Sequence, residues 1–482
     1  MTLFAEGKNC WKVAKAERFA VIVDAADYFK AARAAMLLAE RRIMLIGWDF
    51  DARIRLRGEP LEPGEPETVG AFIRWLADRR PSLEIYLLRW DIGALKTLVR
   101  GTNIFTAVKW ARHTRIHPRL DRIHPPGASH HQKIVAIDDC FAFCGGIDMT
   151  DDRWDTREHL DDQPERLDPG GKAYGPWHDA TSAIDGPAAA ALGELARARW
   201  RCSGGAKLEP IEGRSDCWPP GLEAQFENVD VAISRSIPAM PDQQPVTEIE
   251  QLYLDLIASA KRTIYAESQY FASRRIAEAF GKRLAEPDGP EIVLINPTTA
   301  DGWLEPIAMD TARARLVTAL RSLDPHKRLR LYHAFTAGGA PIYVHAKIMV
   351  IDDVVLRIGS SNMNNRSLRL DTECDVTIDR SRHDAPRLGD NILAVRDGLI
   401  AEHLGLDPEI VTARIAREGS VIAAIEQLRG PGRSLRPYQI PDLNEVEKWL
   451  ADNEVLDPEG PGEMFESPTK RGLFKGWLGR SR

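Results

Sequence analysis

The sequence predicts an α/β protein made of two similar α/β sandwich lobes, each a mixed sheet flanked by helices, packed as a pseudo-dimer with a site between them. Three observations lead to this fold class. A His-x-Lys-x4-Asp motif occurs twice, as His131, Lys133 and Asp138 and again as His345, Lys347 and Asp352. Helix-like and strand-like segments alternate in the same order before each copy. At 482 residues, the chain is also longer than one hydrophobic core usually serves.

The elements before the motifs follow one pattern in both halves of the chain. Apolar periodicity predicts a helix followed by a strand over residues 27–51 and again over 252–275. A second helix, turn and strand are predicted over 71–91 and 279–299. Each half then supplies its motif, whose apolar residues alternate around an Asp-Asp pair as in a β-hairpin. Such an internal repeat indicates one site assembled from two halves of a single chain.

We expect four regions along the chain. They are a first lobe (1–205), an inter-lobe connection rich in Gly, Pro and acidic residues (206–245), a second lobe (246–410), and a C-terminal helical extension with a basic tail (411–482). Towards the C-terminus, helical patterns are predicted roughly over 408–428 and 442–453. Basic and apolar residues alternate over 470–482, which suits either contact with an anionic membrane surface or a solvated, disordered end.

Composition narrows the function classes and the location. The net charge is mildly acidic, 64 − 71 = −7, which disfavours a protein that binds duplex DNA. No apolar stretch reaches about 18 residues, and the N-terminus lacks a signal-peptide pattern. We therefore expect a cytoplasmic protein that meets a membrane only peripherally, at its inner face.

The cysteines do not form a recognisable framework. They are scattered along the chain at Cys10, Cys140, Cys144, Cys202, Cys217 and Cys374. Cys140 and Cys144 have no second Cys or His pair at zinc spacing. Buried free thiols are therefore favoured over a metal site or disulfide bonds.

The doubled motif suits cleavage of a phosphodiester. This reaction needs a nucleophile, a proton for the leaving alkoxide and positive charge on the non-bridging oxygens. His131 and His345 fit the first two roles if their environments separate their pKa values. Lys133 and Lys347 would bind the phosphoryl oxygens as point charges. Because side chains at i and i+2 of a strand share one face, each histidine and its lysine should reach the same cavity.

Further polar residues follow each motif at matched spacing. A polar residue stands 17 positions after each histidine (148 − 131 and 362 − 345). Asn362 can donate a side-chain N–H to a phosphate, and Asp148 is placed with it in the phosphate-binding group, where we expect it to orient Lys133. The residues expected to shape the motifs structurally are Asp138, Asp352, Gly146 and Ser360; the two aspartates are expected to be turn residues.

A nucleophilic imidazole also needs an acceptor for its second nitrogen. The candidates are Asp179 and Glu373, each of which opens an apolar-alternating strand after a motif hairpin. From spacing alone, solvated acids at a strand edge are an equally good interpretation of both residues, and the two interpretations remain open.

A metal-dependent hydrolase is a separate mechanistic class. Its ligands could be drawn from His124, His130, His131, His159 and Asp155. The lysine two positions after His131 argues against this class, because a metal site has no use for a cation there. We expect no metal and no other cofactor.

These residues resemble the phospholipase D superfamily, whose signature is the doubled His-x-Lys-x4-Asp, over roughly residues 7–405. Several segments resemble in particular the phosphatidylcholine-cleaving phospholipases D of eukaryotes and their bacterial relatives. They are Gly145-Gly146-Ile147-Asp148, Pro176-Trp177-His178-Asp179, Glu267-Ser268-Gln269-Tyr270-Phe271, Gly359-Ser360-Ser361-Asn362 and Glu402-His403-Leu404-Gly405.

The resemblance implies a ping-pong transfer on a glycerophospholipid, cleaved at the headgroup-side phosphodiester. His131 would attack phosphorus and form a phosphohistidine. His345 would protonate the leaving alcohol and then activate water or a small alcohol as the acceptor. The remaining site residues would be Lys133, Lys347 and Asn362 on the phosphate, with Asp179 and Glu373 as orienting carboxylates.

Three alternatives compete with a phospholipase D. A cardiolipin-synthase-like phosphatidyltransferase would usually bring N-terminal membrane helices, which are not predicted here. A nucleic-acid phosphodiesterase of the same superfamily often carries one motif in a short dimeric chain, and the net charge also disfavours nucleic acid as a partner. A lipid-binding scaffold without activity is disfavoured because both motifs are intact.

Overall fold

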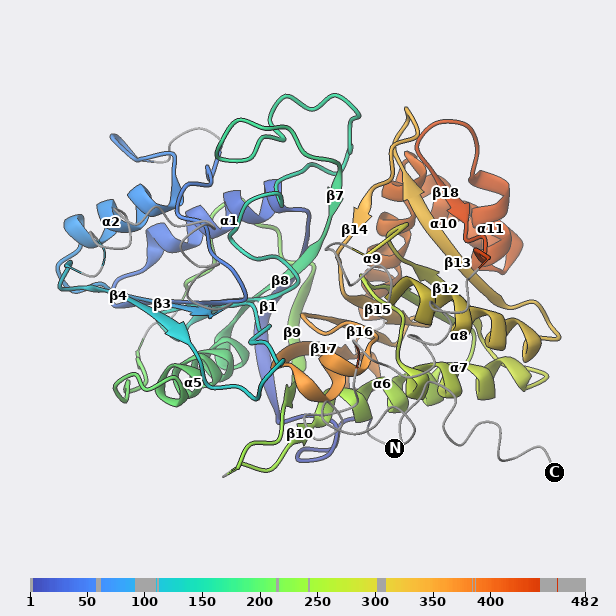
Figure 1. The fold of residues 1–482 in the computed structure, drawn as a ribbon, viewed down its shortest axis with the longest axis horizontal. Helices are drawn as coiled ribbons and strands as arrows, with labels where there is room; N and C mark the ends of the chain where they lie inside the picture. The colour runs from blue at the N-terminus through green and yellow to red at the C-terminus, as the bar shows by residue number, and fades with distance from the viewer. Residues whose placement is uncertain are drawn as a thin grey trace.

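The computed structural model describes residues 3–57, 62–91, 110, 112–213, 216–241, 243–300, 309–383, 385, 387–442 and 457. Helices and strands alternate through the first half of the chain (Figure 1). Its elements are β1 (Lys12–Val23), α1 (Ala25–Leu38), β2 (Arg42–Gly47), α2 (Val69–Arg79), β3 (Glu84–Trp90), β4 (Ile116–Asp121), β5 (Ile134–Ile137), β6 (Phe141–Gly145), β7 (Trp177–His178), β8 (Ala180–Asp185) and α5 (Gly186–Cys202).

The second half repeats this order and adds a C-terminal extension. Its elements are β9 (Phe226–Ile237), β10 (Val246–Thr247), α6 (Glu248–Ser259), β11 (Thr263–Glu267), α7 (Arg274–Ala285), β12 (Glu291–Ile295), α8 (Thr311–Ser322), β13 (Leu329–Phe335), β14 (Tyr343–Val344), β15 (Ile348–Ile351), β16 (Val355–Gly359), the π-helical turn η2 (Arg366–Leu370), β17 (Glu373–Asp379), the 3-10 turn η3 (Arg380–Arg382) and α9 (Arg387–Leu404). The extension comprises α10 (Pro408–Glu418), α11 (Val421–Leu428) and β18 (Ser434–Pro437).

The two halves share one mixed sheet. Its strand order is β18-β13-β12-β11-β15-β16-β17-β9-β1-β8-β6-β5-β2-β3-β4, with β10 paired to β9 at the side. On either side of the central β9–β1 pair the order mirrors itself: β11, β12 and β13 run parallel to one another, as do β2, β3 and β4. The internal repeat predicted from sequence is therefore present in the strand order.

The expectation of two separate lobes is corrected by this sheet. β1 pairs antiparallel with β9, in a register that includes Val13 opposite Ala232 and Phe19 opposite Phe226. β9 pairs on its other side with β17, so backbone hydrogen bonds run continuously across the middle of the molecule. The middle of β9 is buried on both faces, since residues 231–234 are all buried, and the strand lies inside the 206–245 segment that was expected only to connect the lobes.

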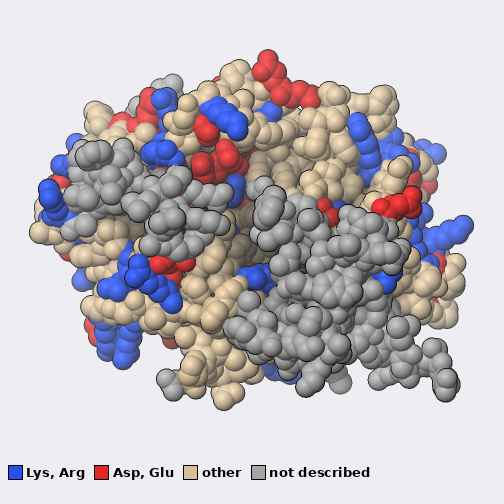
Figure 2. Space-filling model, in the orientation of Figure 1, with Lys and Arg blue, Asp and Glu red and all other residues tan. Residues whose placement is uncertain are grey.

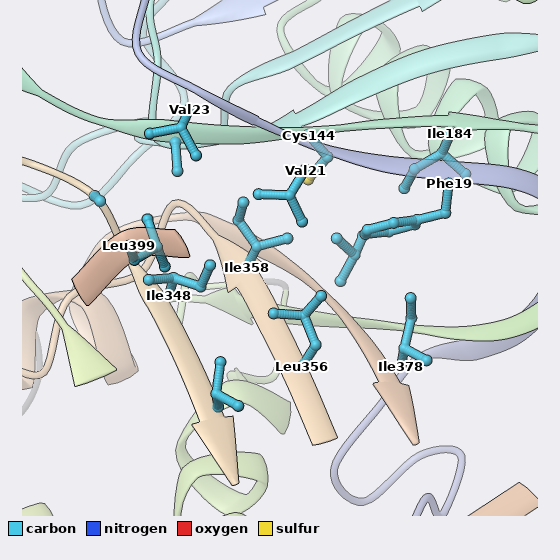
Figure 3. Close-up of a cluster of buried hydrophobic side chains, with 14 of the residues drawn as sticks. Phe19, Val21, Val23, Cys144, Ile184, Ile348, Leu356, Ile358, Ile378 and Leu399 are labelled. Atoms are coloured by element: carbon cyan, nitrogen blue, oxygen red, sulfur yellow. The ribbon is translucent and has the colours of Figure 1, made fainter. Parts of the chain in front are cut away.

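Three clusters of buried apolar side chains fill the spaces between the sheet and its helices. One lies under α1 and α2 of the first half, and a second lies under α6, α7 and α8 of the second half. The third cluster belongs to both halves. In Figure 3, Phe19, Val21 and Ile184 of the first half point towards Ile358 and Ile378 of the second half. The halves thus share one core as well as one sheet.

The C-terminal helices differ from the predicted pattern. The expected helix over 408–428 is divided, because Gly419 ends α10 in a left-handed conformation (φ 64°). Ser420 then begins α11, where its hydroxyl accepts a hydrogen bond from the backbone N–H of Ala423 at 2.9 Å. The helix predicted over 442–453 lies, apart from its first residue, outside the described residues, and so does the basic tail over 470–482.

The expectation that the cysteines are free thiols is wrong for two of them. Cys140, at the β5–β6 turn, is bonded to Cys217, and their Cα atoms are 5.9 Å apart. The two residues are separated by 77 positions, so sequence spacing did not reveal the pair. Cys10, Cys144 and Cys374 are free and buried, and Cys202 is free and exposed.

None of the helices in the described part of the chain has the length and apolar character needed to cross a membrane.

Candidate active site

Each motif histidine is paired with a carboxylate from the opposite half of the chain. Nδ1 of His131 lies 2.9 Å from Oε2 of Glu373, and Nδ1 of His345 lies 2.6 Å from Oδ2 of Asp179. Both carboxylates are fully buried. Because Nδ1 is engaged in each ring, Nε2 is left to face a substrate. The structure thus brings together the two histidines and the two acids that spacing alone left open.

A backbone hydrogen bond places each motif histidine next to its acid. The N–H of His131 donates to the carbonyl of Thr372, next to Glu373, at 2.9 Å. The N–H of His345 donates to the carbonyl of His178, next to Asp179, at 2.7 Å. The short strands β7 and β14 pair in parallel at this point. Both contacts cross between the halves, so the site exists only when the halves are joined.

The His-x-Lys segments lie just before the strands and not within them. β5 begins at Ile134 and β15 at Ile348, each one residue after the motif lysine. The two lysines are nevertheless placed equivalently, since each Nζ donates to the carbonyl of its own motif histidine, Lys133 to His131 and Lys347 to His345. Both lysine side chains are buried.

The two lysines differ in their remaining surroundings. Nζ of Lys133 forms an ion pair with Oδ2 of Asp148 at 3.1 Å. Oδ1 of Asp148 accepts the backbone N–H of Trp48 at 3.0 Å, which fixes the carboxylate. Lys347 has Asn362, not an acid, at the matching sequence position. The pKa of Lys347 is lowered to about 7, mainly by burial; the charge of Asp179 opposes this shift and the nearby charge of Lys133 adds to it.

The electrostatics of the first pair favour a neutral imidazole. Burial, followed by the charges of Lys133 and Lys347, holds the pKa of His131 well below its ordinary value. Burial likewise raises the pKa of Glu373 to about 8, although Lys133 and the Ser360 hydroxyl oppose the shift. A neutral His131 keeps one nitrogen lone pair free, which is the state a nucleophile requires; the lone pair is on Nε2 when Nδ1 carries the proton and donates it to the ionised form of Glu373.

The second pair has a different charge distribution. Although burial alone would raise it, the charge and hydrogen bond of His345 lower the pKa of Asp179 to about 2, so this acid is ionised. Burial and the charge of Lys347 keep the pKa of His345 well below its ordinary value, although Asp179 opposes the shift. An anionic substrate would counter these positive charges and favour proton uptake by His345.

Small residues of the motifs make room for the acids. A side chain at Gly146 would collide with the carboxylate of Asp179. Ser360 donates its hydroxyl to Oε2 of Glu373 and accepts the N–H of Cys374 at 3.0 Å. The Asn362 amide is buried, and its Nδ2 donates to Oε1 of Gln269 at 3.4 Å.

Asp138 and Asp352 face away from the histidines. The carboxylate of Asp138 accepts the backbone N–H groups of residues 40, 41 and 42, and that of Asp352 accepts those of residues 261, 262 and 263. Each aspartate therefore connects a hairpin turn to the start of the neighbouring strand, β2 or β11, which runs antiparallel to the first strand of the hairpin. This geometry fits the structural role expected for them.

Aromatic rings line both sides of the histidines. Trp48 stacks on Trp90 with ring centroids 5.8 Å apart, and its ring lies edge-on to His131. On the other side Trp177 stacks on Tyr343 at 4.5 Å and lies 5.2 Å from His345.

The residues considered for a metal site do not converge. His130 lies 2.6 Å from the Thr372 hydroxyl, and His124 accepts a hydrogen bond from Trp90 at 3.0 Å. His159 is paired with Asp155. Among the described residues, two other groups could hold a cation: one of Asp24, His159, His178 and Glu402, and one of His178, Glu267 and His403.

We call the residues of these two groups the buried histidine–carboxylate cluster: Asp24, His159, His178, Glu267, Glu402 and His403. Sequence reasoning assigned none of them a role in the phosphodiester site and considered only His159, as a ligand of the alternative metal site. Four of them stood in quoted segments, namely His178, Glu267, Glu402 and His403. For His178, the sequence feature that could have indicated a role is its position directly before Asp179.

A cavity of about 440 Å³ opens beside the first lysine. It lies at the carboxyl ends of the parallel strands β2, β3 and β4, the usual place for ligands in such sheets. Lys133 and Asp148 form part of its wall, and most of the rest is apolar, including Leu45, Leu87 and Ile147. An anionic group at the lysine could therefore carry an apolar chain.

The arrangement is suited to phosphoryl transfer. It offers one neutral imidazole, a second imidazole hydrogen-bonded to an ionised carboxylate, two buried lysines and an amide donor. These groups can supply a nucleophile, a general acid and base, and positive charge for the non-bridging oxygens of a phosphodiester.

Comparison with known proteins gives matches of several kinds. Residues 253–386 match a family model described as cardiolipin synthase, PLD-like domain. Phospholipase D1 of Saccharomyces cerevisiae is 25% identical over 497 aligned residues, covering 81% of this chain and 29% of the relative. Phospholipase D alpha 4 of Arabidopsis thaliana is 24% identical, covering 79% of this chain and 63% of the relative. The chain thus spans less than two thirds of these relatives.

A solved structure shares the fold. The crystal structure of phosphatidylserine synthase from Haemophilus influenzae Rd KW20 superposes with a TM-score of 0.54, covering 86% of this chain and 95% of that chain, at 12% sequence identity.

Proposed function

Since the chain belongs to the phospholipase D superfamily, we propose that it cleaves the headgroup-side phosphodiester of glycerophospholipids through a phosphohistidine intermediate. The observation that carries this proposal is the crossed pairing of the two motif histidines with Glu373 and Asp179, beside two buried lysines. The names of the curated relatives support a phospholipid as the substrate.

In the first step, Nε2 of His131 attacks phosphorus. Glu373 holds the opposite ring nitrogen and so keeps the lone pair aimed at the substrate. The new P–N bond forms as the bond from phosphorus to the headgroup oxygen breaks. His345 gives its Nε2 proton to that leaving oxygen, and Asp179 stabilises the ring while it carries the proton.

In the second step, His345 takes a proton from water as the water oxygen attacks phosphorus. The P–N bond breaks, His131 regains its lone pair and phosphatidate leaves. Lys133, Lys347 and Asn362 bind the non-bridging oxygens in both steps, and Asp148 keeps Lys133 in place. If a small alcohol replaces water, the product is a new phospholipid.

The cavity beside Lys133 supports an amphiphilic substrate. A phospholipid places apolar chains within reach of its phosphate, which matches an apolar cavity that touches the phosphate-binding lysine. On the face shown in Figure 2, basic and acidic side chains of the described residues are intermixed, and no continuous basic track is visible there. A nucleic-acid backbone would favour such a track.

A phosphatidyltransferase of the cardiolipin-synthase type is the second candidate. The description of the family model and the name of the solved structure favour it. The two candidates share the first step and differ in the acceptor. Product analysis with water alone and with added glycerol, serine or phosphatidylglycerol separates them, because a transferase yields little phosphatidate.

The proposal is tested by trapping the intermediate. A phospholipid labelled at phosphorus, with p-nitrophenol as its headgroup, is mixed with the wild type, His131→Ala and His345→Ala. This leaving group needs no proton, so we expect a covalent adduct to accumulate in His345→Ala and to be absent in His131→Ala. His326→Ala, at an exposed histidine, serves as the control and should behave as the wild type.

Two results would contradict the proposal. An adduct in His131→Ala but not in His345→Ala would exchange the two roles. Release of p-nitrophenol at wild-type rates by both variants would show that neither histidine carries the reaction.

A further inference from the structure

The buried histidine–carboxylate cluster lies directly behind the second pair. We propose that Asp24 is a positioning residue, which together with this cluster holds Asp179, and through it His345, in the reacting geometry. This inference rests on the proposed function, because it assigns His345 the role of general acid and base. Asp24 itself touches neither motif histidine in the hydrogen bonds and ion pairs of the described residues.

Asp24 and Asp179 are joined by two hydrogen bonds of opposite direction. The backbone N–H of Asp24 donates to the carbonyl of Asp179 at 2.7 Å. The backbone N–H of Asp179 donates back to Oδ1 of Asp24 at 3.0 Å. The backbone of Asp179 is thus held on both sides while its carboxylate reaches His345. A small displacement of Asp24 would move the acid that orients the ring.

The backbone of Asp24 is strained. Its φ of 66° and ψ of 153° fall in a region that glycine enters freely and other residues enter at a cost. Asp24 stands between β1 and α1, where glycine would relieve the strain. The aspartate side chain must therefore contribute interactions that offset it, and those interactions are the hydrogen bond to Asp179 and the contacts with the cluster.

The cluster supplies fixed charge around Asp24. Oδ2 of Asp24 lies 3.5 Å from Nε2 of His159, and Oδ1 lies 3.4 Å from Nδ1 of His178. Oε1 of Glu402 lies 3.1 Å and 2.7 Å from the same two nitrogens. All four side chains are fully buried. Each of the two imidazoles therefore lies between the same two acids, Asp24 and Glu402.

The acids of this group favour the protonated forms of its two histidines. Burial lowers the pKa of His159, but Asp24, Asp155 and Glu402 together raise it to about 9, and Glu267 and Glu402 raise that of His178 well above its ordinary value. The 2.7 Å between Nδ1 of His178 and Oε1 of Glu402 is an ion-pair distance.

Outer partners lock the cluster to both halves of the protein. Glu267 on β11 accepts hydrogen bonds from His178 at 2.7 Å and from His403 at 3.0 Å. Glu402 and His403 stand on α9, and Arg157 pairs with Glu402 at 2.5 Å. Glu267 and Glu402 of the second half thus hold His178 and His159, which are the direct partners of Asp24 in the first half.

The test separates the two steps of the reaction. With p-nitrophenol as the headgroup, the first step needs no proton from His345, whereas hydrolysis of the intermediate needs His345 as base. For Asp24→Asn and Asp24→Gly we expect the initial burst of p-nitrophenol to keep its amplitude and to change in rate by less than about 3-fold. Steady-state turnover should fall roughly 10-fold in Asp24→Asn and 100-fold in Asp24→Gly, within the range of general acid–base effects.

A matched control removes a buried carboxylate elsewhere. Asp324 accepts the backbone N–H groups of Arg328 and Leu329, both at 2.9 Å, and touches no member of the cluster. Asp324→Asn should leave both the burst and the turnover unchanged. If Asp24→Gly does not fold, Asp24→Asn still tests the proposal, because it preserves the size of the side chain and an oxygen acceptor for the N–H of Asp179.

Each other outcome counts against the inference. Equal loss of burst and turnover in the Asp24 variants would assign Asp24 a general structural role, and unchanged turnover would assign it no role. A stoichiometric metal in the purified wild type, whose removal reproduces the Asp24→Asn defect, would replace the protonated cluster by a metal site. Absence of a burst in the wild type would instead reject the proposed function itself.

Discussion

Each motif histidine takes its acid from the other half of the chain. The two pairs link residues 242 and 166 positions apart in sequence. The environments of the two acids differ as well, since the pKa of Glu373 is raised to about 8 while that of Asp179 is lowered to about 2. Two nearly identical sequence motifs therefore give two chemically different histidines, which is the condition for separate nucleophile and acid roles.

The pKa of Lys347 predicts how activity depends on pH. With a pKa of about 7, this lysine loses its charge as the pH rises above neutrality. Because only the protonated form attracts the phosphate, kcat/KM for a phospholipid should fall with increasing pH above about 7. In Lys347→Arg, whose guanidinium stays charged, this decline should move to higher pH. A decline at the same pH in both proteins would contradict the assignment; the measurement is kcat/KM from pH 5 to 9.

At the level of elements, the hairpins repeat a structural device. Asp352 holds three consecutive backbone N–H groups at the start of β11, as Asp138 does for β2. Each aspartate thereby connects the hairpin that follows the His-x-Lys segment to the antiparallel strand beside it. These hydrogen bonds account for the position of the final Asp of each motif, which points away from the histidines.

Removing this acid should affect stability more than catalysis. Asp352→Ala leaves three backbone N–H groups without their acceptor, of which that of Thr263 is buried, and should lower the free energy of unfolding by about 2–3 kcal/mol, measured by urea denaturation. The kcat of the folded protein should stay within about 3-fold of the wild type. Asp353→Ala, on the same turn but with a partly exposed ion pair, should cost about 1 kcal/mol or less. A large kcat loss in Asp352→Ala with unchanged stability would show a catalytic role.

At the scale of the whole molecule, the halves form a single unit. The β1–β9 pair joins their sheets, and one apolar cluster contains side chains of both (Figure 3). The two pairs of motif histidine and acid cross the same boundary. Neither half can bury its inner face or complete its histidine pair without the other.

A shared core predicts cooperative unfolding. Calorimetry should show one transition for the wild type and for Ile358→Ala, in which a fully buried side chain of the shared cluster is truncated. This substitution should cost about 2–5 kcal/mol and shift the whole transition downwards. Ile410→Ala, at an exposed position of α10, should leave the transition nearly unchanged. Two transitions, of which only one moves in Ile358→Ala, would show that the halves unfold independently.

Local patterns in the sequence predicted much of the fold. The helix–strand repeats over 27–51 and 252–275 appear as α1–β2 and α6–β11, because apolar periodicity reports directly which face of an element is buried. The motif hairpins appear as β5–β6 and β15–β16 for the same reason. Long-range pairings were not predictable in this way. The Cys140–Cys217 bond and the role of β9 as a central strand depend on contacts between distant segments.

The sequence by itself determined that this protein has two related halves, each with a histidine, a lysine and a following hairpin. Those features are written in residue spacing, and spacing controls only what happens within an element or a turn. The tertiary structure alone decided which acid meets which histidine, that the sheets merge into one, and that Asp24 and its cluster stand behind Asp179. Such contacts arise from the packing of segments more than a hundred residues apart, and no local pattern specifies their geometry.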